Sequence, residues 1–278
     1  MAMTLTGFEN DGFHFGVRDW GPADGRPLIA LHGFPQTSSS WSGVADRLVA
    51  AGLRVLAPDQ RGYSSAARPP EVSAYRIDRL AGDVLALADA AGLDRFDLLG
   101  HDWGGAVAWH LAARHPDRVA TLSVASTPHP RAMQRAWRGS QALRSWYMLA
   151  FQLPWLPERV LGGPLGPRWL ASSGAPDPQQ MRHLLSDRST ATGAVNWYRA
   201  MLRRDVPGTG RISVPTLYVW SDRDVALGRR AAEGTAAYVD GDYTFVELAG
   251  VSHWIPDERP DDLASAVLAH LDRHGDRP

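Results

Sequence analysis

The sequence predicts an α/β fold with a mostly parallel central sheet, flanked by helices and interrupted by a helical insertion. Two observations favour this class. Apolar runs typical of strands alternate with helical patterns over residues 13–125 and again over residues 214–272, as a parallel sheet covered on both faces requires. Between these parts, residues 129–212 show only helical patterns rich in Trp, Arg, Pro and Gly. We therefore expect residues 1–128 and 213–278 to form one α/β core, and residues 129–212 to form a helical cap domain.

Each core element follows from its local pattern. Residues 13–17 alternate as an edge strand would, and residues 27–32, 53–59, 95–99, 118–124, 214–220 and 243–248 form short apolar runs typical of buried strands. Helical spacing covers residues 41–51, 77–91, 106–114, 229–237 and 260–272. Gly52 and Gly92 follow two of these helices directly, as a helix stop often does.

Composition excludes several classes of function. The 278 residues are enough to bury a full core, and the net charge of −1 indicates no basic field for nucleic acid or for a membrane surface. The chain contains no Cys, which rules out disulfides and thiolate metal sites. The N-terminus lacks a signal-peptide pattern, and no run approaches the roughly 18 apolar residues of a membrane helix. We expect a cytoplasmic protein without metal, cofactor, nucleic-acid or membrane partner; the sequence does not predict its oligomeric state.

The stretch Gly100-His101-Asp102-Trp103-Gly104-Gly105 lies between a predicted strand and a predicted helix. It follows the nucleophile-elbow pattern, with Asp at the position where Ser is usual. Such a turn lifts one side chain clear of the sheet, toward the free N–H groups of the first helical turn. We expect Asp102 to attack carbon and form an ester. The simpler alternative is an Asp that caps the helix.

A nucleophile of this kind needs an acid and a histidine later in the chain. The loop after the strand at 214–220 carries Asp222 and Asp224, and the loop after the strand at 243–248 carries His253. Both loops follow carboxyl ends of strands, where open α/β sheets gather functional groups. We assign His253 as the base and Asp224 as its orienting acid, in preference to Asp222.

The loop His32-Gly33-Phe34-Pro35 follows the first predicted buried strand. Its backbone is placed to supply an oxyanion donor, the N–H of Phe34, which pairs with the N–H of Trp103 after the nucleophile. An ordinary glycine-proline turn is the alternative interpretation of this loop taken alone.

Together these residues resemble the epoxide hydrolase branch of the α/β-hydrolase superfamily over essentially the whole chain. The resemblance rests on five segments: His32-Gly33-Phe34-Pro35, Asp59-Gln60-Arg61-Gly62-Tyr63-Ser64, Gly100–Gly105, Asp224 and Gly250-Val251-Ser252-His253-Trp254. It implies a cofactor-independent hydrolase acting on ether bonds, which converts an epoxide to a vicinal diol. It also implies a substrate pocket bounded by four aromatic residues: Phe34, Trp103, Trp197 and Trp254.

Epoxide opening needs a proton donor for the ring oxygen, and relatives use two cap tyrosines. The predicted cap contains two, Tyr147 and Tyr198. Tyr147 stands four residues before a Phe-Gln pair, and Tyr198 lies in Asn196-Trp197-Tyr198-Arg199. Both contexts resemble those of the family's tyrosines, so we expect both to donate hydrogen bonds to the ring oxygen. Packing on a cap helix, with the hydroxyl in water, is the alternative for either one.

Two other functions remain open from the sequence. A haloalkane dehalogenase would use the same Asp102 with halide donors from Trp103 and a cap Trp, and a hydrolase-fold protein could bind a small ligand without turnover. Fluoroacetate dehalogenation is disfavoured, because Trp103 and Ala106 stand where that family places Arg. The arginines at the start of the cap, Arg131, Arg135, Arg138 and Arg144, could meet an anionic partner, but their spacing fits a solvated helix face.

Overall fold

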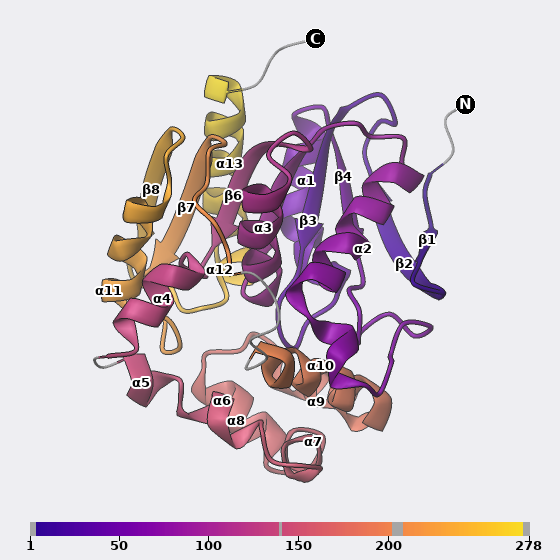
Figure 1. The fold of residues 1–278 in the computed structure, drawn as a ribbon, viewed down its shortest axis with the longest axis vertical. Coiled ribbons are helices and arrows are strands. Elements are labelled where there is room, and N and C mark those ends of the chain that lie inside the picture. Colours follow the sequence, from indigo (N-terminus) through magenta and orange to yellow (C-terminus); the bar gives the residue numbers. More distant parts are fainter. Residues whose placement is uncertain (1–3, 139–140, 202–207, 275–278) are drawn as a thin grey trace.

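The computed structural model describes residues 4–138, 141–201 and 208–274. Residues 139–140 and 202–207 of the predicted cap therefore lie outside the described residues. Figure 1 shows helices on both faces of one sheet and a group of further helices beyond one end of it. The eight strands of the sheet are β1 (Gly7–Asn10), β2 (Phe13–Trp20), β3 (Arg26–Leu31), β4 (Leu53–Pro58), β5 (Phe96–His101), β6 (Val119–Ala125), β7 (Thr216–Ser221) and β8 (Tyr243–Leu248).

The strand order is β1-β2-β4-β3-β5-β6-β7-β8. Strand β2 is antiparallel to both of its neighbours, and every later pair from β4 to β8 is parallel. The predicted mostly parallel sheet is therefore confirmed. The carboxyl ends of its parallel strands all lie at one end of the sheet. The turn after β5 and the loops after β3, β7 and β8 therefore lie at that same end.

Strand β1 is the one strand of the described chain that the sequence analysis missed; the short helix Ile255–Glu258 was not predicted either. It pairs with β2 in a hairpin whose turn residues, Asp11 and Gly12, both have positive φ. Asp-Gly between two short apolar runs is a recognised hairpin signal, so the information was present in the sequence. Two predicted helices also differ in detail. The first predicted helix begins with a 3-10 turn at Ser38–Trp41 before α1. The helix predicted over 229–237 is α-helical only as far as Glu233, and a 3-10 turn at Gly234–Tyr238 follows it.

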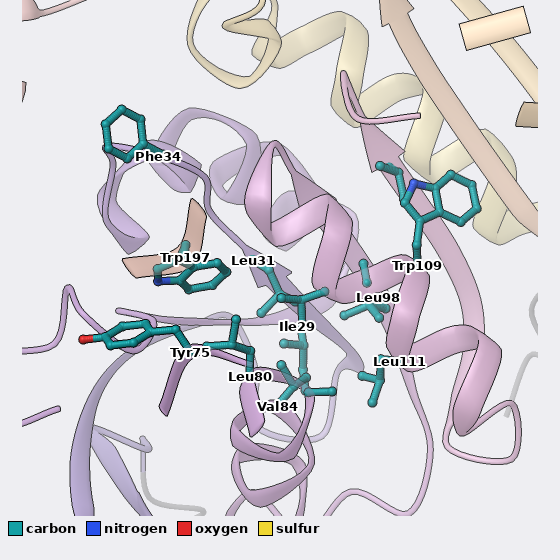
Figure 2. Close-up of a cluster of buried hydrophobic side chains, with 14 of the residues drawn as sticks. Ile29, Leu31, Phe34, Tyr75, Leu80, Val84, Leu98, Trp109, Leu111 and Trp197 are labelled. Carbon is teal, nitrogen blue, oxygen red and sulfur yellow. The ribbon is translucent and has the colours of Figure 1, made fainter. Parts of the chain in front are cut away.

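Alternate side chains of the inner strands face different helical layers, as the period of two in a strand requires. Leu28 and Ala30 of β3 pack with α1 (Ser42–Ala50) and α13 (Pro260–His274). Ile29 and Leu31 pack on the other face with α2 (Ile77–Ala90) and α3 (Trp103–Arg114), as Figure 2 shows. Full burial of such an aliphatic side chain contributes roughly 1.5–3 kcal/mol. The two clusters therefore hold the strand ends, and the loops that follow them, in fixed positions.

In the described part of the chain between β6 and β7, seven helices lie at the end of the sheet where the parallel strands finish (Figure 1). They are α4 (Pro130–Ala136), α5 (Gln141–Arg144), α6 (Trp146–Ala150), α7 (Leu156–Leu161), α8 (Gly166–Ser172), α9 (Pro178–Ser186) and α10 (Arg188–Met201). The longest, α10, packs on the core through Trp197, whose side chain belongs to the cluster of Figure 2. After β7 come α11 (Arg229–Glu233) and α12 (Ile255–Glu258). No helix in the described part of the chain combines the length and the apolar character that a bilayer-crossing segment needs.

Candidate active site

Asp102 occupies a strained turn between β5 and α3. Its backbone has φ 51° and ψ −120°, a region in which a residue with a side chain is rarely found. The turn closes because glycine lines it. A Cβ on Gly100 would lie 2.5 Å from the Gly104 carbonyl oxygen, and one on Gly104 would lie 2.6 Å from the His32 carbonyl oxygen. The small residues of the motif are therefore required by the close approach of α3 to two strand ends.

The loop after β3 brings a backbone donor to this carboxylate. The N–H of Phe34 donates to Oδ1 of Asp102 at 2.7 Å. His32 holds the loop in place, since its Nδ1 donates to the Gly33 carbonyl oxygen at 3.0 Å and its Nε2 accepts from the N–H of Gln60 at 3.1 Å. Trp103, the second predicted donor, is the first residue of α3, where a backbone N–H has no acceptor within its own helix.

The structure brings His253 and Asp224 to the same point from two separate loops. Oδ2 of Asp224 lies 2.7 Å from Nδ1 of His253, and Nε2 of His253 lies 3.4 Å from Oδ2 of Asp102. The other oxygen of Asp224 accepts hydrogen bonds from the N–H groups of Ala226 and Leu227, each at 2.8 Å. Asp222, by contrast, is exposed and accepts from the N–H of Gly250.

Charge and burial set the protonation of this group. Burial by itself lowers the pKa of His253, but the charges of Asp224 and Asp102 outweigh it and raise that pKa to about 10. Burial raises the pKa of Asp102, and the hydrogen bond and charge of His253 reverse this, so that the net pKa is lowered. At neutral pH the resting site therefore holds an ionised Asp102 beside a protonated His253.

Tyr147 and Tyr198 come together from α6 and α10. Their ring centroids are 5.9 Å apart, and Tyr198 packs edge-on against Trp103 at 4.9 Å and against Phe34 at 5.3 Å. Burial raises the pKa of both hydroxyls, and the negative charge of Asp102 raises both further. Both tyrosines therefore stay protonated at neutral pH, close to the charge of Asp102.

Comparison with known proteins agrees with this geometry. A model of the α/β hydrolase fold matches residues 26–158. Epoxide hydrolase A of Mycobacterium tuberculosis is 33% identical, over 89% of this chain and 91% of the relative, and an AB hydrolase superfamily protein of Bacillus subtilis is 33% identical over 94% and 95%. A solved epoxide hydrolase from hot-environment metagenomes superposes with a TM-score of 0.85 at 32% identity, covering 98% of this chain and 99% of that one. This chain belongs to the epoxide hydrolase branch of the α/β-hydrolase superfamily.

Within this branch, the four predicted pocket residues have unequal surroundings. Phe34, Trp103 and Trp197 border the tyrosine pair or each other, with Trp103 and Trp197 5.7 Å apart. Trp254 packs edge-on against His253 at 5.5 Å, and its indole N–H donates to the Ser173 carbonyl oxygen at 3.1 Å. Trp254 thus joins the catalytic loop to helix α8.

Two further aromatic residues line the same cluster and were not singled out in the sequence. Phe151 lies 4.8 Å from Tyr198 and 5.8 Å from Phe34, and Trp169 lies 5.9 Å from Tyr147, between ring centroids. The signal for Phe151 was available, because it stands four residues after Tyr147 and therefore on the same helical face. Trp169 comes from α8, and no local pattern relates it to the tyrosines.

His101 and Ser126 form a second support that the sequence analysis missed. The Ser126 hydroxyl donates to the carbonyl oxygen of His253 at 2.8 Å, and Nε2 of His101 lies 2.9 Å from the same oxygen. Because a carbonyl can only accept, His101 carries its proton on Nε2. Burial lowers the pKa of His101 to about 4, which keeps its ring neutral. Within the described ranges, no group of three or more His, Cys, Asp or Glu side chains is arranged to hold a metal ion.

Proposed function

We propose that this protein is an epoxide hydrolase that converts an apolar epoxide to a vicinal diol through an ester on Asp102. The observation that carries the proposal is the pairing of an elbow aspartate with two protonated tyrosines, Tyr198 buried and Tyr147 partly buried, next to a His253–Asp224 pair. The chain's epoxide hydrolase relatives support the same activity. We also propose that residues 129–212 act as a cap domain that supplies the tyrosines, and that the protein works in the cytoplasm.

The first step is ring opening. Oδ1 of Asp102 is held by the Phe34 N–H, so we assign Oδ2 as the attacking atom. It forms a bond to one ring carbon while the carbon–oxygen bond of the ring breaks. Tyr147 or Tyr198 gives a proton to the departing oxygen and the other tyrosine donates a hydrogen bond to it, which offsets the charge that develops there.

The second step hydrolyses the ester. Alkylation removes the charge of Asp102, which is one of the two carboxylates that raise the pKa of His253. The imidazole can then pass its proton to the tyrosinate left by ring opening, accept a new proton from water, and give that proton to the oxygen that departs from the acyl carbon. Water attacks the carboxyl carbon of Asp102, and the N–H groups of Phe34 and Trp103 stabilise the oxyanion. The bond between the acyl carbon and Oδ2 breaks, and the diol leaves with Oδ2, the oxygen that attacked the ring carbon.

The alternative functions have less support. A dehalogenase needs two N–H donors for halide. The indole N–H of Trp197 already donates to the Arg61 carbonyl oxygen at 2.9 Å, and Trp146 and Trp155 are 60% exposed, which leaves Trp169, beside Tyr147, to act with Trp103. A binding protein without turnover would not need the contacts between His253, Asp224 and Asp102.

Intact mass spectrometry of His253→Gln tests the proposal. This variant should form the ester but hydrolyse it slowly, so incubation with a mixture of epoxides should add the whole mass of one epoxide. Asp102→Asn/His253→Gln, the matched control, should gain no mass.

The possible outcomes separate the hypotheses. A gain equal to a haloalkane less its hydrogen halide, from a parallel mixture, would assign the protein to the dehalogenases. An adduct that persists in the Asp102→Asn control would refute the assigned nucleophile. Absence of any adduct, together with absence of diol from the wild type, would favour a binding protein.

A further inference from the structure

Charge is distributed very unevenly between the core and the segment that links β6 to β7. Residues 129–212 contain 12 arginines and 4 acidic residues, a net charge of +8, whereas the rest of the chain has 17 arginines and 26 acidic residues, a net charge of −9. The overall charge of −1, from which we expected no membrane partner, conceals this division. Residues 129–212 are therefore attracted to negatively charged surfaces, whereas the rest of the chain is repelled by them.

The arginines of the two parts also differ in their partners. Many core arginines form ion pairs, for example Arg54 with Asp19 and Arg61 with Asp83, whereas between β6 and β7 Arg199 and Arg211 do so in the described part of the chain. Between β6 and β7, Arg159, Arg168 and Arg188 are exposed, and within the ranges the structure describes none of the three has an ion-pair or hydrogen-bond partner for its guanidinium. Their charge is therefore available to an external partner.

Exposed apolar side chains gather in the same segment. Of the eight large apolar side chains that are exposed in the described part of the chain, six lie within residues 146–165. We call these six the apolar patch: Trp146 (60% exposed), Leu149 (63%), Leu153 (47%), Trp155 (60%), Leu156 (40%) and Leu165 (58%). Six exposed large apolar side chains within twenty residues of chain differ from the single, scattered apolar residues of an ordinary soluble surface.

On helix α6, two members of the patch lie on the face away from the active site. Tyr147 and its neighbour four residues on, Phe151, lie on one face and join the aromatic cluster beside Asp102. Trp146 and Leu149 lie on the opposite face at a spacing of three residues, and both are exposed. The inward face is therefore occupied by the site, and the outward face is left without a partner.

The patch borders a groove in which aromatic and cationic groups meet. Trp155, Arg159 and Arg188 line this surface groove of about 640 Å³ between α7 and α9–α10. The one carboxylate that lines it, Glu158, pairs with Arg199 at 2.7 Å and so does not neutralise the two free arginines. An indole beside unpaired guanidiniums matches the boundary of a bilayer, where indoles lie at headgroup level and guanidiniums bind phosphate.

We propose that the apolar patch, with Arg159, Arg168 and Arg188, docks onto the surface of an anionic lipid bilayer. Leu and Trp side chains would enter the boundary between headgroups and acyl chains, while the arginines contact lipid phosphates. A second copy of the chain is the weaker candidate, because a two-fold interface would place two equally basic surfaces against each other. Docking would also bring the cap to a phase in which apolar epoxides accumulate; this consequence rests on the proposed function, and the docking does not.

Vesicle co-sedimentation of the full chain tests the proposal without substrate. We expect wild type to bind vesicles of equal parts phosphatidylglycerol and phosphatidylcholine, and not vesicles of phosphatidylcholine alone. Each arginine near an anionic bilayer contributes about fivefold to partitioning, so Arg159→Gln/Arg188→Gln should bind about thirtyfold more weakly. Trp155→Ala should also bind more weakly, and high salt should release the wild type.

The matched control is Arg95→Gln/Arg273→Gln. It changes the net charge by the same amount. Arg95 precedes β5, at the end of the sheet where the parallel strands begin, and Arg273 lies in the last turn of α13, a helix whose C-terminal end lies far from α6–α9 in Figure 1. We expect it to bind as wild type does. Equal weakening by both double variants would reduce the effect to net charge and overturn the proposal. So would failure of the wild type to bind anionic vesicles at low salt, or sedimentation velocity showing a dimer that the groove variants dissociate.

Discussion

We predict that Asp224→Asn slows ester hydrolysis far more than alkylation, and the contacts of Asp224 supply the reason. Three donors point at the Asp224 carboxylate: the N–H groups of Ala226 and Leu227 meet one oxygen, and Nδ1 of His253 meets the other. An Asn side chain offers only one acceptor oxygen. If that oxygen faces His253, two buried backbone N–H groups lose their acceptor, at roughly 1–3 kcal/mol each. We therefore expect the oxygen to face the backbone and the NH₂ group to face the ring.

That orientation imposes the wrong tautomer on His253. An NH₂ group donates to Nδ1, so the ring proton moves to Nε2, the nitrogen that must accept a proton from water. In hydrolase triads this change lowers turnover about 10⁴-fold, which corresponds to about 5.5 kcal/mol of transition-state stabilisation. Alkylation of Asp102 needs no base, and we expect it to change by less than about tenfold. The ester should therefore accumulate in Asp224→Asn.

Single-turnover kinetics with quenched-flow mass spectrometry measures both steps directly. Asp222→Asn is the matched control, since it makes the same substitution two residues away on an exposed side chain that contacts the Gly250 N–H. We expect hydrolysis in this control to stay within about threefold of wild type. The reasoning is refuted if Asp222→Asn loses ester hydrolysis and Asp224→Asn retains it, or if Asp224→Asn slows alkylation as much as hydrolysis.

Three further predictions address other parts of the site. Tyr147→Phe and Tyr198→Phe should each slow alkylation by about 10²-fold and leave ester hydrolysis unchanged, because each removes a donor to the ring oxygen; a stopped-flow burst of normal rate in the double variant would contradict this. Gly33→Ala should lower turnover more than about tenfold, because its Cβ would lie 2.6 Å from Oδ1 of Asp102. The control, Gly16→Ala, places its Cβ in open space and should act as wild type in the same steady-state assay. Ester hydrolysis should slow as the pH falls through the pKa that His253 has in the ester, and this pKa lies below the value of about 10 in the resting site. The rate of alkylation should stay level between about pH 6 and pH 9. Rapid-quench measurements in which both rates fall together would contradict this.

Local patterns were enough to predict most of the fold. Runs of apolar residues gave seven of the eight strands to within a few residues, because each buried strand is too short and too apolar to suit another structure. The elbow was predictable for a steric reason: only glycine fits at positions 100 and 104 when α3 starts against two strand ends. The helical insertion was visible because strand patterns stop between β6 and β7.

The contacts that lock the site were not predictable from local patterns. Ser126 reaches the carbonyl oxygen of His253 across 127 positions of sequence, and Trp254 reaches Ser173 across 81. The first pair follows from the order of strands, which places the end of β6 two strands from the end of β8, and the second from the packing of the helical insertion on the loop after β8. Exposure on the cap was also beyond sequence patterns, because Trp146 and Tyr147 are adjacent aromatic residues on a helix and only packing separates them.

In the mechanism proposed above, the same contacts explain why the two steps occur in order. In the resting site, His253 is held between two carboxylates and stays protonated, so water meets no base there. Alkylation cancels the charge of Asp102 without moving its Oδ1 from the Phe34 N–H, and Asp224 remains in place through its three hydrogen bonds. One covalent bond thus lowers the pKa of His253 and presents an ester carbonyl to the oxyanion donors at once. A serine at position 102 would carry no charge to cancel. An aspartate in this turn therefore links alkylation of the nucleophile to the pKa of the base, His253.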